Sequence, residues 1–313
     1  MKNEAVDIKP VQQRTPAGLK KTGLTAFATP YLFLLPALLV YCAIVIYPIL
    51  NSLWLTMYQW DGVNPVKKFV GLDNFVYLFT KDPVFYIALK NNLKWSVASL
   101  ILPVTMGLVF ALLFNTARRG FSFFRGAFYF PATLSLIIIG TIWTWMYDPN
   151  FGLINNFLKL ISGGNWSFDW FGNPPNTIFF VVLAASWAYS GICMLMFMSG
   201  LQAISKDIYE SAVIDGVNRL QKLIYITLPL LKNTLNVVLV TTLVNSFQVF
   251  DIIFVMTNGG PGRATNVLAS WSYAQVFTYH DMGRGTAIAW VLAFIVLFIS
   301  IFSNRLSSKN NDY

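Results

Sequence analysis

The chain has 313 residues, of which 56% are hydrophobic and only 11% are charged, whereas an average soluble domain carries about 25% charged residues. Too few polar side chains remain to cover a water-exposed surface, so the composition excludes an ordinary soluble enzyme and indicates a protein that faces lipid. The net charge of +9 is scattered between the apolar runs, which favours a role in membrane orientation over a nucleic-acid partner.

Six apolar segments are long enough to cross a bilayer, because a helix needs about 20 such residues to do so. The sequence therefore predicts an all-α integral membrane protein with about six transmembrane helices. Pro131 and several aromatic residues crowd the beginning of the third segment, but proline is tolerated in membrane helices. The six segments are Tyr31–Leu55, Leu93–Phe114, Ala127–Met146, Thr177–Gly200, Thr234–Met256 and Gly285–Ser303.

An even number of spans places both termini on one side of the membrane. With the N-terminus in the cytoplasm, 14 of the 22 Lys and Arg residues fall in cytoplasmic segments, as the positive-inside rule requires. The expected organisation is a cytoplasmic tail over residues 1–29, a six-span domain over 30–304 and a cytoplasmic tail over 305–313.

Residues 201–233, between the fourth and fifth predicted spans, read as two short cytoplasmic helices. Asp207 can cap the first helix with Glu210 as its reciprocal partner, and Gly216 can end that helix in a left-handed conformation. Asn218 can cap the second helix, and Pro229 is expected to stop it. Such a helix pair either converts a push on its surface into motion of the attached spans or lies on lipid headgroups.

The residues Glu210-Ser211-Ala212, Asp215-Gly216 and Ile226-x-Leu228-Pro229 resemble, in identity and spacing, the EAA signature of binding-protein-dependent ABC importer permeases. Serine replaces the usual first alanine. The stretches Gly71–Phe79, Phe130–Asn155 and Phe247–Gly262 resemble the carbohydrate-uptake branch of that family, so the resemblance extends over nearly the whole chain after Tyr31.

This resemblance implies the ABC type I importer permease fold, in the plasma membrane of a bacterium or archaeon. It implies four kinds of partner besides membrane lipid: a second, homologous permease, an ABC ATPase pair, an extracellular solute-binding protein and a carbohydrate substrate. The ATPase would contact Glu210, Ser211, Ala212, Asp215, Gly216 and Pro229. No cofactor is expected on this chain, since it has no G-x-x-x-x-G-K-[ST] phosphate loop and the ATPase would bind ATP and magnesium.

Polar residues in the fifth span are candidates for the substrate path. Asn245, Gln248 and Asp251 recur every three residues, which would place them roughly along one helical face. Trp187 and Tyr189 on the fourth span are candidate stacking partners for a sugar ring. The alternative is that the amides only bind neighbouring helices and that Asp251 lies at the interface without a ligand.

Three other classes of membrane protein compete with the importer, and one of them, a channel, would need a selectivity motif that is not visible in the sequence. An ion-coupled secondary transporter of a small polar solute tends to carry ionisable residues deep in its spans, and the only candidate here is Asp251. A membrane enzyme needs a catalytic cluster. The single histidine, His280, and the isolated cysteines, Cys42 and Cys193, provide neither such a cluster nor a metal site.

Overall fold

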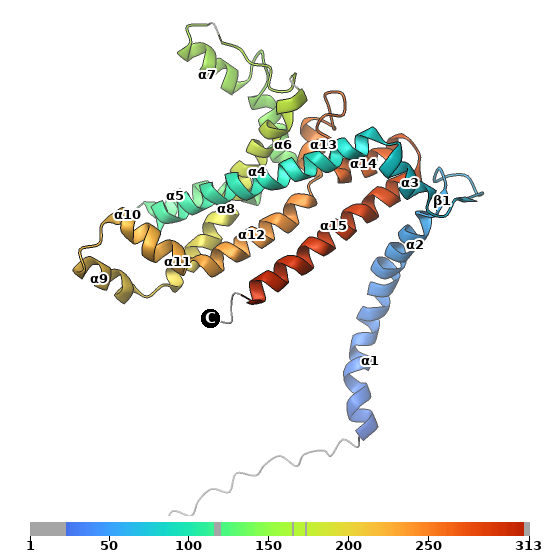
Figure 1. Cartoon of the computed structure of the whole chain (residues 1–313), viewed down its shortest axis with the longest axis horizontal. Coiled ribbons are helices and arrows are strands. Elements are labelled where there is room, and N and C mark those ends of the chain that lie inside the picture. Colours follow the sequence, from blue (N-terminus) through green and yellow to red (C-terminus); the bar gives the residue numbers. More distant parts are fainter. Residues whose placement is uncertain (1–22, 116–119, 165, 173, 310–313) are drawn as a thin grey trace, which may run out of the picture. The chain divides into compact units, whose positions relative to one another are not determined.

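The computed structural model describes residues 23–115, 120–164, 166–172 and 174–309, and these residues are almost entirely helical. The strands found among them are two short ones, β1 (Tyr58–Gln59) and β2 (Lys68–Phe69), which pair antiparallel with Tyr58 opposite Phe69. The chain divides by its internal contacts into Met1–Ser52 and Leu53–Tyr313 (Figure 1). The expected tail over residues 1–29 lies mostly outside the described residues, as do residues 310–313.

The first unit is one apolar helical path made of α1 (Gly23–Tyr41), the π-helical turn η1 (Cys42–Ile46) and most of α2 (Tyr47–Leu55). Its membrane-spanning part, Tyr31–Leu55, has the bounds that the sequence predicted. The π turn ends two residues before Pro48, which has no N–H to donate, and the N–H of Tyr47 donates to the carbonyl of Cys42. Such local adjustments let a membrane helix contain proline.

The second unit is built around four helices: α4 (Pro83–Phe114), α8 (Pro174–Ala203), α12 (Lys232–Phe247) and α15 (Met282–Lys309). Helix α4 packs along α8, and α12 lies beside both (Figure 1). Helices α4 and α8 approach closely at Gly107, where an added Cβ would overlap the Cβ of Cys193. Glycine therefore sets the distance between the two helices at this crossing.

A smaller cluster at one end of the unit joins α3 (Asp73–Thr80), the beginning of α4, α14 (Leu268–Tyr273), the π turn η4 (Ala274–Thr278) and α15. Asp82 caps α4 by accepting hydrogen bonds from the N–H groups of Val84 and Phe85. Its second oxygen accepts a hydrogen bond from the indole of Trp271 at 2.8 Å. This buried carboxylate thus links the cap of α4 to α14.

The third predicted span is not continuous, and the prediction of one helix over Ala127–Met146 was wrong. Helix α5 (Phe121–Tyr129) passes into the 3₁₀ turn η2 (Phe130–Thr133), and α6 (Leu136–Met146) then begins after a bend of 101°. The break follows Pro131, and Ser135 caps the new helix by accepting from the N–H of Ile138. Helix α7 (Leu153–Ile161) comes next, before α8.

The fifth predicted span, Thr234–Met256, is also wrong as a single helix. The chain passes from α9 (Lys206–Ile214) through α10 (Arg219–Gln221), the π turn η3 (Lys222–Thr227) and α11 (Leu228–Leu230), then bends by 66° into α12. Helix α12 ends at Phe247, and a separate helix, α13, covers Asp251–Met256. The remaining spans agree with the sequence except that α4 begins ten residues before Leu93.

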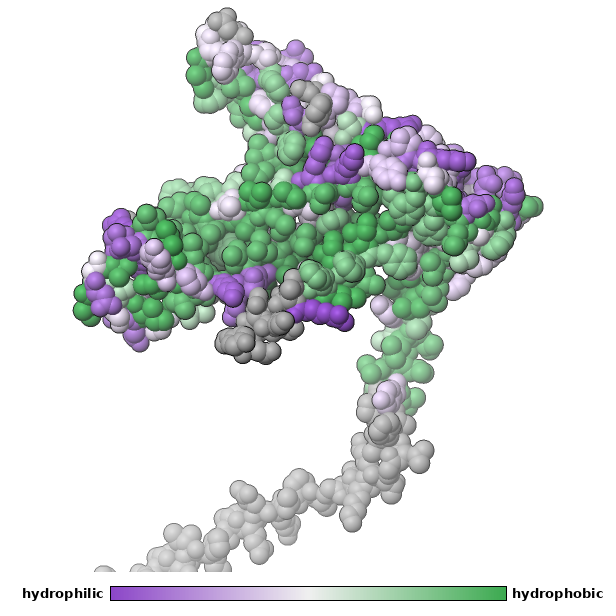
Figure 2. Space-filling model, in the orientation of Figure 1, coloured by the Kyte–Doolittle hydropathy of each residue, from purple (hydrophilic) through white to green (hydrophobic). Residues whose placement is uncertain are grey.

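The helices present an apolar surface suited to a membrane. In the described residues four helices are long and apolar enough to cross a bilayer, and the number becomes six when each bent pair is taken as one span. Large apolar side chains such as Leu93, Val97 and Ile101 remain exposed along α4. Figure 2 shows apolar residues over most of the body, with hydrophilic residues gathered towards its ends. The prediction of about six membrane helices is confirmed.

Candidate substrate cavity and coupling surface

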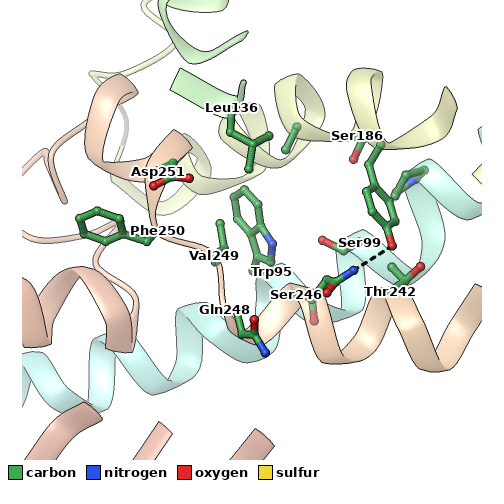
Figure 3. Close-up of a pocket in the computed structure, with 14 residues that line it drawn as sticks. Trp95, Ser99, Leu136, Ser186, Thr242, Ser246, Gln248, Val249, Phe250 and Asp251 are labelled. Carbon is green, nitrogen blue, oxygen red and sulfur yellow. Dashed lines mark hydrogen bonds between the residues drawn. The ribbon is translucent and has the colours of Figure 1, made fainter. Parts of the chain in front are cut away.

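A cavity of about 270 Å³ lies among α4, α6, α8 and the junction of α12 with α13 (Figure 3). Apolar and polar side chains share its wall, and Asp251 is the one lining residue that bears a formal charge at neutral pH. Aromatic rings come from Trp95, Tyr189 and Phe250, hydroxyls from Ser99, Ser186, Thr242 and Ser246, and amides and a carboxylate from Asn245, Gln248 and Asp251.

Four of the five candidate path residues line this cavity, although the reason that the sequence suggested for grouping them was wrong. Asn245 is in the last turn of α12, Gln248 caps that helix, and Asp251 begins α13, so the three do not share one helical face. The break in the chain brings them together instead. Asn245 donates to the hydroxyl of Tyr189 at 3.4 Å, which connects α12 to α8.

The fifth candidate, Trp187, does not line the cavity. Its ring packs edge-on against Trp143 of α6, with centroids 5.9 Å apart, in the main apolar cluster. The sequence analysis missed Trp95 and Ser99, which line the cavity from α4. Their spacing of four residues, which places them on one face of the helix, was the signal that could have identified them.

Side chains of α4 form hydrogen bonds near the break between α12 and α13. Asn92 donates to the carbonyl of Phe247, where α12 ends, and accepts from the N–H of Leu268. The hydroxyls of Ser96 and Ser246 lie 2.7 Å apart. An interrupted helix leaves backbone groups unpaired, and the bond from Asn92 satisfies one of them, the carbonyl of Phe247, in a region where water is scarce.

Residues 201–233 form two short helices, as expected, but the residue that caps the first helix is Ser205 and not Asp207. The Ser205 hydroxyl accepts from the N–H of Asp207 at 3.3 Å, and Glu210 takes no part in capping. Gly216 has the predicted left-handed conformation, with φ of +73°. Asn218 forms the predicted cap, in a reciprocal capping box with Gln221.

The helix does not stop at Pro229 as predicted. It continues to Leu230 and bends by 66° before Lys232. The π turn η3 ends two residues before Pro229, just as η1 ends two residues before Pro48. Both prolines are accommodated by widening the preceding turn, because the missing N–H and the ring disturb the regular hydrogen-bond ladder upstream.

Helix α9 presents an open groove of about 420 Å³ lined by Lys206, Tyr209, Glu210, Val213, Ile214 and Lys222. Val213 and Ile214 are 65% and 86% exposed, so an apolar ridge stands beside the charged Glu210. Ser211 and Asp215 are also exposed, whereas Ala212 is buried within this chain. In the described residues, no group of three or more His, Cys, Asp or Glu side chains could hold a metal ion.

The arrangement, a bundle with broken spans around a partly polar cavity and a helix pair between α8 and α12, defines a membrane transport subunit. The family described as "Binding-protein-dependent transport system inner membrane component" matches residues 103–308, and the chain belongs to it. It is therefore an inner-membrane component of a transport system and not an enzyme, as the sequence predicted.

Several relatives of this chain are named as permease proteins of transport systems. The chain is 36% identical over 285 residues to a probable ABC transporter permease protein, YurN, of Bacillus subtilis, which covers 90% of this chain and 97% of the relative. It is 34% identical to the arabinooligosaccharides transport system permease protein AraP of Bacillus subtilis, and the match covers 96% of this chain and 98% of that relative. It is 33% identical to the trehalose/maltose transport system permease protein MalF of Thermococcus litoralis, and the match covers 90% of this chain and 94% of that relative.

A solved structure confirms the fold. A chain from the crystal structure of a bacterial ABC transporter involved in the import of the acidic polysaccharide alginate superimposes with a TM-score of 0.78 at 25% identity. The match covers 91% of this chain and 96% of that chain. The ABC type I importer permease fold that the sequence predicted is confirmed.

Proposed function

We propose that this chain is the permease subunit of an ATP-driven importer that moves a carbohydrate, delivered by an extracellular solute-binding protein, across the membrane. The cavity beside the break in α12 carries the proposal, since it combines aromatic faces with amides and a carboxylate. Sugars present hydroxyls that such groups can bind and apolar faces that rings can cover. The names of the maltose and arabino-oligosaccharide relatives support this substrate class.

The cavity also has the size and position that transport requires. Its volume of about 270 Å³ is close to the lower end of small-ligand sites, about 300 Å³, so it suits one or two sugar units at a time. It is bounded by the ends of broken helices, and rearrangement at such junctions opens a central site to one side and then to the other. Asn245, Gln248 and Asp251 would bind hydroxyls, with Tyr189 stacking on the sugar ring.

In this proposal Trp187 does not contact the sugar and instead packs on Trp143 outside the cavity. The importer consists of this chain, a second homologous permease, an ABC ATPase pair that binds ATP and magnesium, and the solute-binding protein. The family to which the chain belongs makes an ion-coupled secondary transporter the weaker hypothesis.

We propose that the ATPase contacts the groove of α9. Glu210, Ser211, Asp215 and Val213 offer an exposed charged and apolar surface, while Ala212 supports the helix from its buried side. Gly216 permits the turn between α9 and α10, and Pro229 lies before the bend into α12. Motion of α9 would therefore reach the cavity along α12. In this proposal residues 201–233, the N-terminal tail and residues 305–313 lie in the cytoplasm.

The experiment that tests the proposal is affinity purification of the tagged chain from its native membrane, followed by mass spectrometry. Recovery of an ABC ATPase and a second permease in near-equal amounts supports the assembly. Reconstituted vesicles containing that complex, ATP and the solute-binding protein should then accumulate the radiolabelled sugar that the binding protein holds. Recovery of the chain alone, or uptake without ATP, would overturn the proposal.

A further inference from the structure

Helix α7 carries an apolar face that nothing in the described chain covers. Leu153, Phe157, Leu160 and Ile161 are 66%, 59%, 80% and 67% exposed. Their spacing of four, seven and eight residues places them on one side of a helix. A contiguous exposed patch of this kind marks a surface that another apolar phase or partner contacts.

The opposite side of α7 is fixed to its surroundings, so the exposed face has a defined direction. Asn155 is fully buried, and its side chain donates to the carbonyl of Phe168 at 2.8 Å and accepts from the N–H of Phe168 and the indole of Trp170, each at 3.2 Å. One amide thus joins the helix to the segment that returns to α8. The apolar face cannot turn inward without breaking these buried bonds.

A short turn attaches α7 to the end of a membrane helix. Only residues 147–152 separate α6 from α7, and the Asp148 carboxylate accepts from the N–H groups of Asn150 and Phe151. Tyr147 is buried and donates to the carbonyl of Phe180 in α8 at 3.2 Å. Six residues span about 20 Å even when extended, and this turn is compact, so α7 begins close to that end of α6.

The helix that precedes α7 also exposes apolar side chains. Trp145, in the last turn of α6, is 64% exposed, and Ile137 and Ile138 are exposed at the beginning of that helix. In Figure 2 the lobe that contains α7 shows apolar residues on the flank that leads to the apolar body. Trp166, 67% exposed after α7, and Lys159 on the helix are residue types that favour the headgroup layer.

We propose that α7 is an interfacial helix that lies in the plane of the membrane surface, with the face formed by Leu153, Phe157, Leu160 and Ile161 inserted at the boundary between headgroups and acyl chains. An amphipathic helix of this kind binds lipid through its buried apolar area. Its consequence is mechanical, because a lipid-anchored α7 holds the outer ends of α6 and α8 at a constant depth while the cavity beside them changes shape.

The test measures the depth of single nitroxide labels on the full chain in lipid nanodiscs. Cys42 is first replaced by alanine, since Cys193 is buried and Cys42 is exposed. Labels are attached at L160C and F157C, both on the apolar face, and at S167C in the exposed connection to α8 as the matched control. Collisions with dissolved oxygen report lipid exposure, and collisions with a water-soluble nickel chelate report water exposure.

The expected result is a several-fold higher ratio of oxygen to nickel collisions at positions 157 and 160 than at position 167. A nickel-accessible face would overturn the proposal in favour of a solvent-exposed helix. Exclusion of both reagents would overturn it in favour of a protein contact, and repeating the measurement with and without the solute-binding protein would identify that contact. Neither outcome affects the proposed transport function, which depends on the cavity and not on α7.

Discussion

The side-chain amide of Asn92 in α4 donates to the backbone carbonyl of Phe247 at 3.2 Å, at the residue where α12 ends. The same side chain accepts from the N–H of Leu268 at 2.8 Å. One buried residue therefore satisfies backbone groups on both sides of the segment that contains the break. Because Gln248 and Asp251 lie one and four residues after Phe247, this contact helps to position two of the cavity's polar groups.

The first prediction concerns this residue. Asn92→Leu leaves a buried carbonyl and a buried N–H unpaired, and each such group costs about 1–3 kcal/mol. We expect the variant to lose roughly 2–4 kcal/mol of unfolding free energy in chemical denaturation of the purified protein. Asn233→Leu, at an exposed position in the first turn of α12, is the matched control. Equal stability of the two variants would contradict the role assigned to Asn92.

The second prediction tests the packing of α4 on α8. A Cβ at Gly107 would lie 2.4 Å from the Cβ of Cys193 and 2.8 Å from the backbone nitrogen of Met194. Gly107→Ala should therefore force the helices apart and cost about 1–3 kcal/mol. The control is Gly126→Ala in α5, where a Cβ would meet nothing within 4 Å. That change should be neutral or slightly stabilising, because alanine favours helix by up to about 1 kcal/mol.

The third prediction concerns the charge of the substrate. Asp251 lies in the cavity wall and has no ion-pair partner among the described residues, so it should repel acidic sugars and favour neutral ones. Asp251→Asn should raise the ratio of acidic to neutral oligosaccharide uptake about tenfold or more in reconstituted vesicles. Two like charges about 4 Å apart repel by about 4 kcal/mol at an effective dielectric constant of about 20, which is more than a tenfold ratio requires.

The control for Asp251 is Asp73→Asn, which removes an exposed carboxylate outside the cavity. It should leave the uptake ratio unchanged. A similar change in both variants would mean that the general surface charge and not the cavity selects the substrate.

The fourth prediction tests the coupling groove. Glu210→Lys reverses the charge of an exposed side chain beside Val213 and Ile214, and a reversed charge at a desolvated contact costs several kcal/mol. We expect sugar uptake to fall at least tenfold and stimulation of ATP hydrolysis by the binding protein to be lost, while the amount of chain in the membrane stays constant. Gln202→Lys, exposed in the last turn of α8 and outside the groove, is the control. Normal uptake by Glu210→Lys would contradict the coupling role.

The sequence was informative wherever a property is local. The apolar run Tyr31–Leu55 appears in the structure with its predicted bounds, because length and hydrophobicity alone decide whether a helix can span lipid. Gly216 and Asn218 have their predicted roles, since a left-handed residue and a cap depend on a few neighbouring atoms. The cap at Asp207 was wrong because α9 already begins at Lys206, so Ser205 is the capping residue and Asp207 lies inside the first turn.

Tertiary structure decided what depends on distant contacts. Nothing between Thr234 and Met256 is a proline or a glycine, so local propensity favours one unbroken helix there. The helix ends at Phe247 in the structure, where Asn92 and Ser96 of α4 contact it from about 150 residues away in the chain. The sequence by itself thus determined a bundle of about six membrane helices with a turn-linked helix pair. Only tertiary packing gathered Trp95, Tyr189, Asn245, Gln248 and Asp251 around one cavity, because a broken helix in the membrane is stable only where its partners satisfy the backbone groups that it exposes.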